Sequence, residues 1–308
     1  MYHVGKEVII LEKRQIGKSE ISISEIGLGC MSLPTNITEA EKIIQTAMEH
    51  GITYYDTADL YDRGENEKIL GTLLKPHRQD IVIASKVGNR LNENGDGWHW
   101  DASKEWIQTA IHESLKRLQT DYIDVYQLHG GTMDDNVDEV IDTMESLKKE
   151  GLIREYGISS IRPNVINRFL QKSNAVSVMM QYSLLDRRPE EWLHLLEQNE
   201  TTLLSRGSLA KGMLTEDEGL IRAKKAGDYL SYTNKELLDT IGELKSLDAS
   251  LTSIALHYVL QSGAAIVGAS SPEQLLETIE AYQAKIPDDL LAKASEITKK
   301  TTYSEHRI

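Results

Sequence analysis

The chain has 308 residues, of which 40% are hydrophobic and 27% are charged, a composition that can bury a large core. Its 34 Lys and Arg against 48 Asp and Glu give a net charge of −14, which opposes general binding to nucleic acid or anionic membranes. No apolar run approaches the ~18 residues of a membrane span, and the single cysteine, Cys30, excludes an internal disulfide framework, so we expect a cytoplasmic protein.

The pattern begins with an N-terminal extension over residues 1–13 and a small hairpin that leads into a first strand at Ile26–Gly29. Thr38 and Glu41 have the spacing of a capping box, which predicts the start of a helix that ends at Gly51. From there, strand and helix patterns alternate. The eight strand candidates cover residues 26–29, 52–56, 80–86, 121–129, 153–159, 175–183, 201–207 and 264–270.

This alternation favours a single (β/α)8 TIM barrel over residues 14–308, with additional C-terminal helices, rather than a doubly wound sheet. The length is compatible with this class, because single-domain barrels take about 250 residues. No composition shift or flexible linker divides the chain. In such a barrel, the loops after the strands form the active face.

Ionisable side chains end three successive strand candidates. Asp56 ends the second, Lys86 the third and His129 the fourth, and the loop after Asp56 carries Asp59 and Tyr61. Any one of these could be a solvated strand end, a helix cap or a surface aromatic. Three in consecutive positions favour a catalytic site at the carboxyl ends of the strands.

Motifs spread from about residue 14 to residue 300 give these positions a context. They are "YYDTADLYDRGENEKILG", "IVIASK", "LKRLQTDYIDVYQLH", "GLIREYGIS", "QYSLLDR", "SRGSLAKGMLT" and "IVGASSPEQLLETIEA". In this order they resemble the aldo-keto reductase superfamily, and most closely its bacterial branch related to potassium-channel β-subunits. The resemblance implies an NAD(P)H-dependent barrel enzyme that reduces aldehydes and ketones to alcohols.

Carried over position by position, the resemblance places a catalytic tetrad on Asp56, Tyr61, Lys86 and His129. Tyr61 would be the general acid, Lys86 and Asp56 would tune it, and His129 would orient the carbonyl. The chemistry is consistent with this, since a tyrosine with a pKa near 10 needs a nearby ammonium to act near neutral pH. No metal is expected, because the nine histidines are scattered and form no HExxH motif.

Cofactor residues follow from the same resemblance, whereas "GLGCMS" lacks the third glycine of a dinucleotide fingerprint. In barrels, phosphates bind at the loops after strands seven and eight. The expected cofactor-binding residues are Ser159, Gln181, Tyr182, Ser205, Arg206, Leu209, Lys211, Gly212, Gly268, Ser270, Gln274 and Glu277. Gln181 shares inward parity with Met179, and Tyr182 would stack on the nicotinamide.

Two departures from the family pattern concern the cofactor. Ser160 replaces the Asn that usually holds the carboxamide, and the strand-eight loop lacks the cation that often binds the 2′-phosphate of NADP. Arg206 and Lys211 on the other loop could compensate. We therefore expect NADPH, with NADH possible.

Substrate expectations rest on the strand-one and strand-three loops. Met31, Trp98 and Trp100 could line an apolar pocket for medium-sized neutral aldehydes or ketones, or the tryptophans could anchor their loop. We expect a monomer or small homo-oligomer that acts on a small molecule. Two alternatives stay open: a lyase with Lys86 as a Schiff-base nucleophile, and a module that senses nicotinamide redox state for a partner protein.

Overall fold

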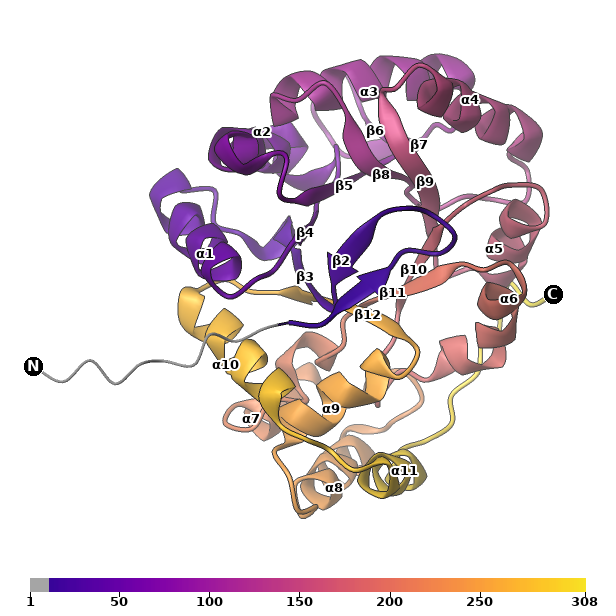
Figure 1. Cartoon of the computed structure of the whole chain (residues 1–308). Helices are drawn as coiled ribbons and strands as arrows, with labels where there is room; N and C mark the ends of the chain where they lie inside the picture. Colours follow the sequence, from indigo (N-terminus) through magenta and orange to yellow (C-terminus); the bar gives the residue numbers. More distant parts are fainter. Residues whose placement is uncertain (1–10) are drawn as a thin grey trace, which may run out of the picture.

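Eight parallel strands close into a barrel in this computed structural model, which describes residues 11–308 (Figure 1). The barrel strands are β3 (Ile26–Gly29), β4 (Tyr54–Asp56), β5 (Val82–Val87), β8 (Ile123–Leu128), β9 (Ile153–Ser159), β10 (Ser177–Gln181), β11 (Thr202–Arg206) and β12 (Gly263–Gly268). They neighbour one another in chain order, and β12 pairs with β3 to close the barrel. The predicted (β/α)8 class is confirmed. Of the expected N-terminal extension, residues 1–10 lie outside the described residues.

Helices surround the barrel and cover the outward faces of its strands (Figure 1). They are α1 (Ile37–Glu49), α2 (Glu65–Leu74), α3 (Lys104–Leu118), α4 (Val137–Lys149), α5 (Pro163–Leu170), α6 (Leu193–Gln198), α7 (Gly219–Ala226), α8 (Asn234–Leu244), α9 (Leu251–Leu260), α10 (Pro272–Gln283) and α11 (Asp288–Ile297). Within residues 11–308, none of them has the length and apolar character needed to cross a bilayer.

Two hydrophobic clusters form the core because alternate strand residues point to opposite faces. The larger cluster lies between strands and helices, and the smaller one fills the barrel. The smaller cluster contains Ile16, Ile21, Ile23, Tyr54, Val82, Ala84, Val125, Val176, Met179, Leu204, Ala264 and Ile266. Three of these isoleucines come from the hairpin of β1 (Lys13–Gln15) and β2 (Ser22–Ser24), which covers one end of the barrel (Figure 1). Access to the interior is therefore from the carboxyl ends of the strands.

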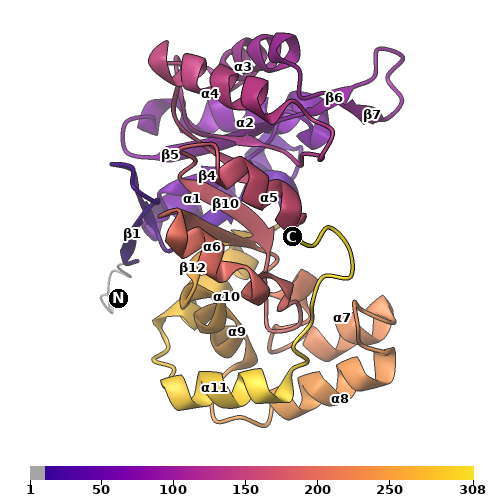
Figure 2. The same cartoon turned by 90° about the vertical axis from the view of Figure 1, so that its right-hand side faces the viewer.

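A second hairpin marks that open end. The loop after β5 contains β6 (Asn89–Leu91) and β7 (Trp98–Trp100), which pair antiparallel. Figure 2 shows β6 and β7 on the opposite side of the molecule from β1 and the N-terminus. The long loop expected after strand three is thus an ordered hairpin at the active face.

The start of α1 differs from the prediction. Asn36 is the N-cap residue, and its side chain accepts hydrogen bonds from the backbone N–H groups of Thr38 and Glu39 at 3.0 and 3.3 Å. The predicted capping box of Thr38 and Glu41 is therefore wrong. Asn caps as well as Thr does and stands two residues earlier, so the helix begins before the predicted cap.

Candidate active site

A polar layer lies on top of the apolar barrel interior. Asp56, Lys86 and Gln127 each stand two residues after a member of the inner cluster, so their side chains also point inward. Each is at most 4% exposed. Three successive strands therefore bring three buried polar groups to the open end of the barrel.

Lys86 is the centre of this layer. Its Nζ donates to Asp56 Oδ2 at 2.6 Å, to the Thr57 carbonyl at 2.7 Å and to the Tyr61 hydroxyl at 3.4 Å. Gln127 Nε2 donates to the other oxygen of Asp56 at 3.2 Å. The predicted partnership of Asp56, Tyr61 and Lys86 is a single connected group in the structure.

The charge on Lys86 survives complete burial because of its partners. Burial lowers the pKa of Lys86, but attraction to and hydrogen bonding with Asp56, together with the Tyr61 hydroxyl, outweigh it and raise the pKa above its usual value. The site therefore holds a permanent positive charge beside a tyrosine hydroxyl.

His129 approaches Tyr61 from the end of β8. The two rings meet edge to face with centroids 5.9 Å apart, and Asn89 fixes the backbone by donating to the His129 carbonyl at 3.0 Å. Burial, followed by the charges of Lys86 and Arg206, lowers the pKa of His129 to about 3. The imidazole is therefore neutral at physiological pH. Its Nδ1 and the Gln127 Oε1 are buried without a hydrogen-bond partner among residues 11–308.

Tyr61 stands at the start of an unusual turn. The three residues after it, Asp62, Arg63 and Gly64, have φ values of +47°, +58° and +88°. Two consecutive non-glycine residues in this left-handed region are unfavourable and persist only where surrounding contacts hold them. The turn leads directly into α2 and leaves Tyr61 half-buried at the open end of the barrel.

The next three strands also end in polar residues on their inward faces. These residues are Ser159 on β9, Gln181 on β10 and Arg206 on β11. Gln181 pairs in register with Arg206 and follows the interior residue Met179 by two positions, so the structure has the expected inward parity of Gln181. Its amide donates to the Tyr229 hydroxyl at 3.2 Å. Ser159, at the end of β9, is 7% exposed and lies on the same side of the open end as Gln181.

Arg206 is exposed and lies on the same face of β11 as an interior residue. Its position follows that of the interior residue Leu204 by two, and its charge is among the causes that lower the pKa of His129 and oppose the upward shift of Asp56. Strand parity therefore directs this side chain toward the open end of the barrel. The resemblance alone did not indicate this position.

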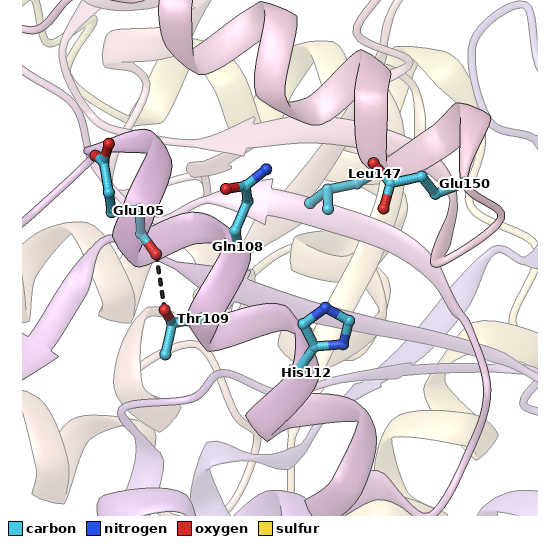
Figure 3. Close-up of a pocket in the computed structure, with 6 residues that line it drawn as sticks. All are labelled: Glu105, Gln108, Thr109, His112, Leu147 and Glu150. Carbon is cyan, nitrogen blue, oxygen red and sulfur yellow. Dashed lines mark hydrogen bonds between the residues drawn. The ribbon is translucent and has the colours of Figure 1, made fainter.

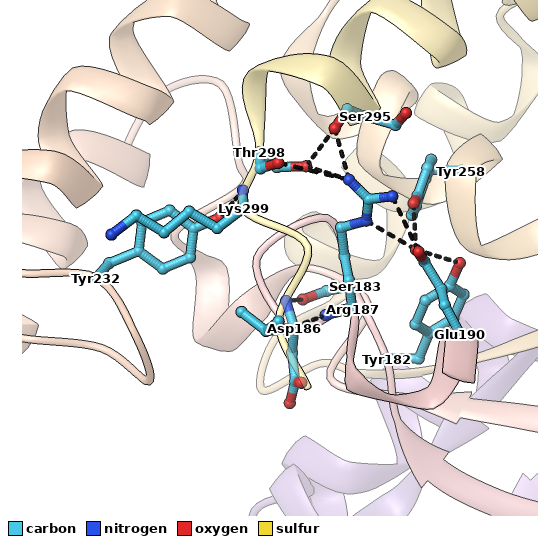
Figure 4. A network of polar contacts seen from close by, with 11 residues as sticks. Tyr182, Ser183, Asp186, Arg187, Glu190, Tyr232, Tyr258, Ser295, Thr298 and Lys299 are labelled. Carbon is cyan, nitrogen blue, oxygen red and sulfur yellow. Dashed lines mark hydrogen bonds and ion pairs between the residues drawn. The ribbon is translucent and has the colours of Figure 1, made fainter. Parts of the chain in front are cut away.

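The side chain of Tyr182 packs against α9 and not against the tetrad. Its side chain is 3% exposed, its hydroxyl donates to Glu190 at 3.4 Å, and its ring lies 5.8 Å from that of Tyr258 on α9. Figure 4 shows both tyrosines directed at the Glu190 carboxylate, which Arg187 also binds. The ring is packed between the barrel wall and α9, so the structure does not bring it together with the tetrad.

The loop after β11 carries the remaining expected contacts on that side. Lys211 is exposed, and both it and Gly212 have left-handed backbone, with φ of +57° and +80°. Leu209 is half-buried. Ser205 is fully buried, on the face of β11 that points away from the barrel interior. Successive backbone N–H groups in such turns form concave sites that suit anions.

A cation that the sequence reading missed lies beside this loop. Arg222 on α7 packs against Gly212, where an added Cβ would lie 2.8 Å from Arg222 Cδ. Its Nε donates to Glu218 Oε2 at 2.8 Å. Nothing in the chain between positions 212 and 222 indicated that α7 folds back onto the loop.

The strand-eight side ends at the N-terminus of α10. Ser271 caps this helix by accepting from the Gln274 N–H, and Ser270 donates to the Gln274 side chain at 2.9 Å. Glu277 is exposed one turn further along, and Gly268 faces Ser32 so closely that a Cβ would lie 2.9 Å from its hydroxyl. A capped helix start, a left-handed loop with Lys211 and orphaned polar atoms by the tetrad fit an extended anionic dinucleotide.

The three expected pocket residues differ in exposure. Met31 and Trp98 are 64% and 53% exposed on loops at the open end. Trp100 instead covers Gly88 and Gly130, and its indole N–H donates to Asp135 at 2.8 Å. The structure thus makes Trp100 an anchor of the β6–β7 hairpin and leaves Met31 and Trp98 free at the rim.

A surface hollow between α3 and α4 lies outside the barrel (Figure 3). Its lining residues are Glu105, Gln108, Thr109, His112, Leu147 and Glu150. The hydrogen bond drawn there joins Thr109 to the Glu105 carbonyl within one helical turn. Apart from the buried Leu147, these are polar side chains of two helices, and the tetrad at the open end of the barrel remains the candidate site.

Comparisons with known proteins agree with this geometry. The Aldo/keto reductase family model matches residues 25–299. The chain belongs to the aldo-keto reductase family. Its relatives include the uncharacterized oxidoreductase YqkF of Bacillus subtilis, 49% identical over 96% of this chain and 100% of that protein. L-galactose dehydrogenase of Arabidopsis thaliana is 30% identical over 88% of each chain.

A solved structure of a related protein has the same fold. The holo form of aldo-keto reductase AKR11C1 from Bacillus halodurans superposes with a TM-score of 0.91 at 46% identity, over 97% of this chain and 100% of that one. This aldo-keto reductase is therefore an oxidoreductase with a nicotinamide cofactor, which confirms the expectation of an oxidoreductase.

Proposed function

We propose that this chain reduces aldehydes and ketones to alcohols with NADPH, and that Tyr61 is the general acid. The observation that carries the proposal is the contact between the buried Lys86 ammonium and the Tyr61 hydroxyl at 3.4 Å. Bringing a tyrosine from pKa ~10 to neutral pH takes about 4 kcal/mol. An ammonium at ~4 Å contributes about that amount at an effective dielectric of ~20.

The carbonyl oxygen would lie between Tyr61 and His129. When bound, the nicotinamide supplies the hydride that the carbonyl carbon accepts. Tyr61 and the neutral imidazole of His129 each donate a hydrogen bond to the oxygen, where negative charge develops, and Tyr61 then transfers its proton. Lys86 stabilises the phenolate that remains, and Asp56 keeps Lys86 charged.

Cofactor contacts are proposed for two regions of the mouth. Ser159 and Gln181 face inward beside the tetrad and suit the carboxamide end. The left-handed loop at Lys211 and Gly212 and the start of α10 suit the phosphates. We assign preference for NADPH to Lys211, with Arg222 behind it, rather than to Arg206, because Arg206 faces the tetrad.

Medium-sized neutral aldehydes are the proposed substrates. Met31 and Trp98 offer exposed apolar surface at the rim. The Schiff-base alternative is disfavoured by the contact of Lys86 with Asp56 at 2.6 Å, since a nucleophilic amine must lose its proton and this contact retains it.

The test is Tyr61→Phe, assayed with NADPH and a panel of neutral aldehydes. We expect kcat to fall by two or more orders of magnitude while the affinity for NADPH, measured by fluorescence titration, stays unchanged. The ring remains in place, and only the acidic hydroxyl is lost. Near-normal turnover by Tyr61→Phe would refute the role of Tyr61, and absence of turnover in a wild-type chain that binds NADPH would favour the redox-sensing alternative.

A further inference from the structure

The left-handed turn after Tyr61 needs an explanation, because two of its three residues are not glycine. We propose that the buried Glu67 and the half-buried Arg117 form a positioning pair that holds this turn and thereby sets the distance between Tyr61 and Lys86. The proposal rests on the general-acid role of Tyr61 given above. Neither residue touches the reacting groups, so both are positioning residues.

Arg117 reaches the turn from α3. A Cβ added at Gly64 would lie 2.9 Å from Arg117 Cδ and 3.1 Å from its Nε, so the side chain lies directly against the backbone of the turn. Gly64 has a φ of +88° and is buried. The left-handed glycine thus gives Arg117 room to support the turn three residues after Tyr61.

Glu67 joins this support to the strand that carries Lys86. Its side chain is completely buried, one oxygen accepts from Arg117 Nε at 2.6 Å, and the other accepts from Ser85 Oγ at 2.5 Å. Ser85 directly precedes Lys86 on β5. The pair therefore links α3, the start of α2 and β5 through one carboxylate.

A second link comes from Asn66, the neighbour of Glu67. Asn66 donates to the Cys30 carbonyl at 2.8 Å and accepts from the Thr57 hydroxyl at 2.6 Å, and Thr57 follows Asp56. The start of α2 is thus fixed to the strand ends that carry both Asp56 and Lys86. Only the short turn from Tyr61 to Gly64 separates these anchors from the tyrosine.

The chemical consequence follows from distance. The Coulomb attraction that favours the Tyr61 phenolate weakens as Tyr61 and Lys86 separate, and a misplaced hydroxyl also loses alignment with the carbonyl. Loss of Arg117 would also leave the buried charge of Glu67 without its cation. Because such a charge is destabilising, the start of α2 would rearrange to expose it. Both effects weaken the stabilisation of the phenolate that remains once Tyr61 has given up its proton, and both slow the reaction.

The experiment compares Arg117→Met and Arg117→Lys with a matched control, Arg78→Met. Arg78 likewise pairs with a buried carboxylate, that of Asp124, at 2.7 Å. It contacts the Ile81 and Tyr122 carbonyls before β5 and β8, at the barrel end away from Tyr61. Each variant is assayed for kcat against pH, NADPH affinity and thermal midpoint.

We expect Arg117→Met to lower kcat at least tenfold and to shift the basic limb of the pH profile upward by half a unit or more, with NADPH affinity retained. Arg117→Lys should recover part of the lost kcat and part of the shift in the pH profile, since lysine keeps the positive charge but lacks the planar guanidinium. Arg78→Met should lose stability but keep the wild-type profile.

An Arg117→Met enzyme with wild-type kcat and pH profile would overturn the proposal. If that variant fails to fold, Arg117→Lys and Ser85→Ala decide the question, and unchanged profiles in both would overturn it equally. Wild-type protein that binds NADPH but turns over no aldehyde would instead refute the proposed function, so the two failures are distinguishable.

Discussion

Lys86 shows at the scale of one residue how burial and charge are reconciled. Its side chain has no solvent exposure, yet Asp56, Thr57 and Tyr61 accept all three of its N–H bonds. A buried ammonium without such partners would lose its proton. The same set of partners that keeps Lys86 charged therefore also gives it the geometry to act on Tyr61.

We expect Lys86→Met to depress the maximum rate and to move the basic limb of the kcat profile upward by about one unit or more, because the positive charge beside the Tyr61 hydroxyl is gone. Lys86→Arg should retain part of the shift. The measurement is kcat from pH 5 to pH 10 with saturating NADPH. An unmoved basic limb in an active Lys86→Met enzyme, or borohydride trapping of Lys86 with substrate, would contradict the tuning role.

Lys211 is the exposed cation of the left-handed loop after β11. We expect Lys211→Ala to lower the ratio of NADPH to NADH affinity several-fold, since the 2′-phosphate loses a charge partner. Fluorescence titration with both cofactors measures this. Lys225→Ala, which removes an exposed lysine near the end of α7, is the control for net charge. Equal weakening of both cofactors would place Lys211 at the shared pyrophosphate instead.

At the scale of elements, α2 and α3 approach so closely that no side chain fits between them at one point. A Cβ at Gly71 of α2 would lie 2.4 Å from the Arg117 carbonyl oxygen on α3. Backbone atoms cannot move aside as a flexible side chain can. The glycine therefore sets the spacing of the two helices that carry Glu67 and Arg117.

We expect Gly71→Ala to destabilise the fold by about 1–3 kcal/mol through overpacking. Gly242, in the last turn of α8, is the matched control, because a Cβ there meets nothing within 4 Å. Gly242→Ala should stabilise the protein by about 0.5–1 kcal/mol, as alanine does in exposed helix interiors. Chemical denaturation of both variants measures the difference, and equal effects would show that helix spacing is not constrained at Gly71.

The whole molecule buries several charges at the active end, and one of them makes its stability depend on pH. Burial, followed by repulsion from Glu67, raises the pKa of Asp59 to about 8. In the unfolded chain, this carboxyl titrates near its ordinary value of about 4. Between these values the folded protein binds the extra proton, so this contribution to stability is present at low pH and is lost as pH rises toward 8.

Asp59→Asn removes this titration. We expect the variant to gain stability relative to wild type at pH 8.5, and to show a flatter dependence of the free energy of unfolding on pH between 5 and 8.5. Urea denaturation at several pH values in this range measures it. A variant with the wild-type slope would show that Asp59 ionises normally in the folded protein.

The sequence by itself determined the barrel, and it predicted that Asp56, Tyr61, Lys86 and His129 meet at one end of it. The alternation of strand and helix patterns leaves few topologies, and Asp56, Lys86 and His129 end successive strands whose carboxyl ends must meet in a closed parallel barrel. The inward parity of Gln181 followed from the two-residue period of a strand. These are local rules, and tertiary packing did not override them.

Only the tertiary structure decided which groups meet across the chain. Glu67 and Arg117 are fifty positions apart and meet because Gly71 lets two helices touch. Tyr182 meets Tyr258 and Glu190 because α9 and the segment after β10 pack together on the outside of the barrel. Such pairings depend on the register and spacing of whole elements, which no short stretch of sequence encodes.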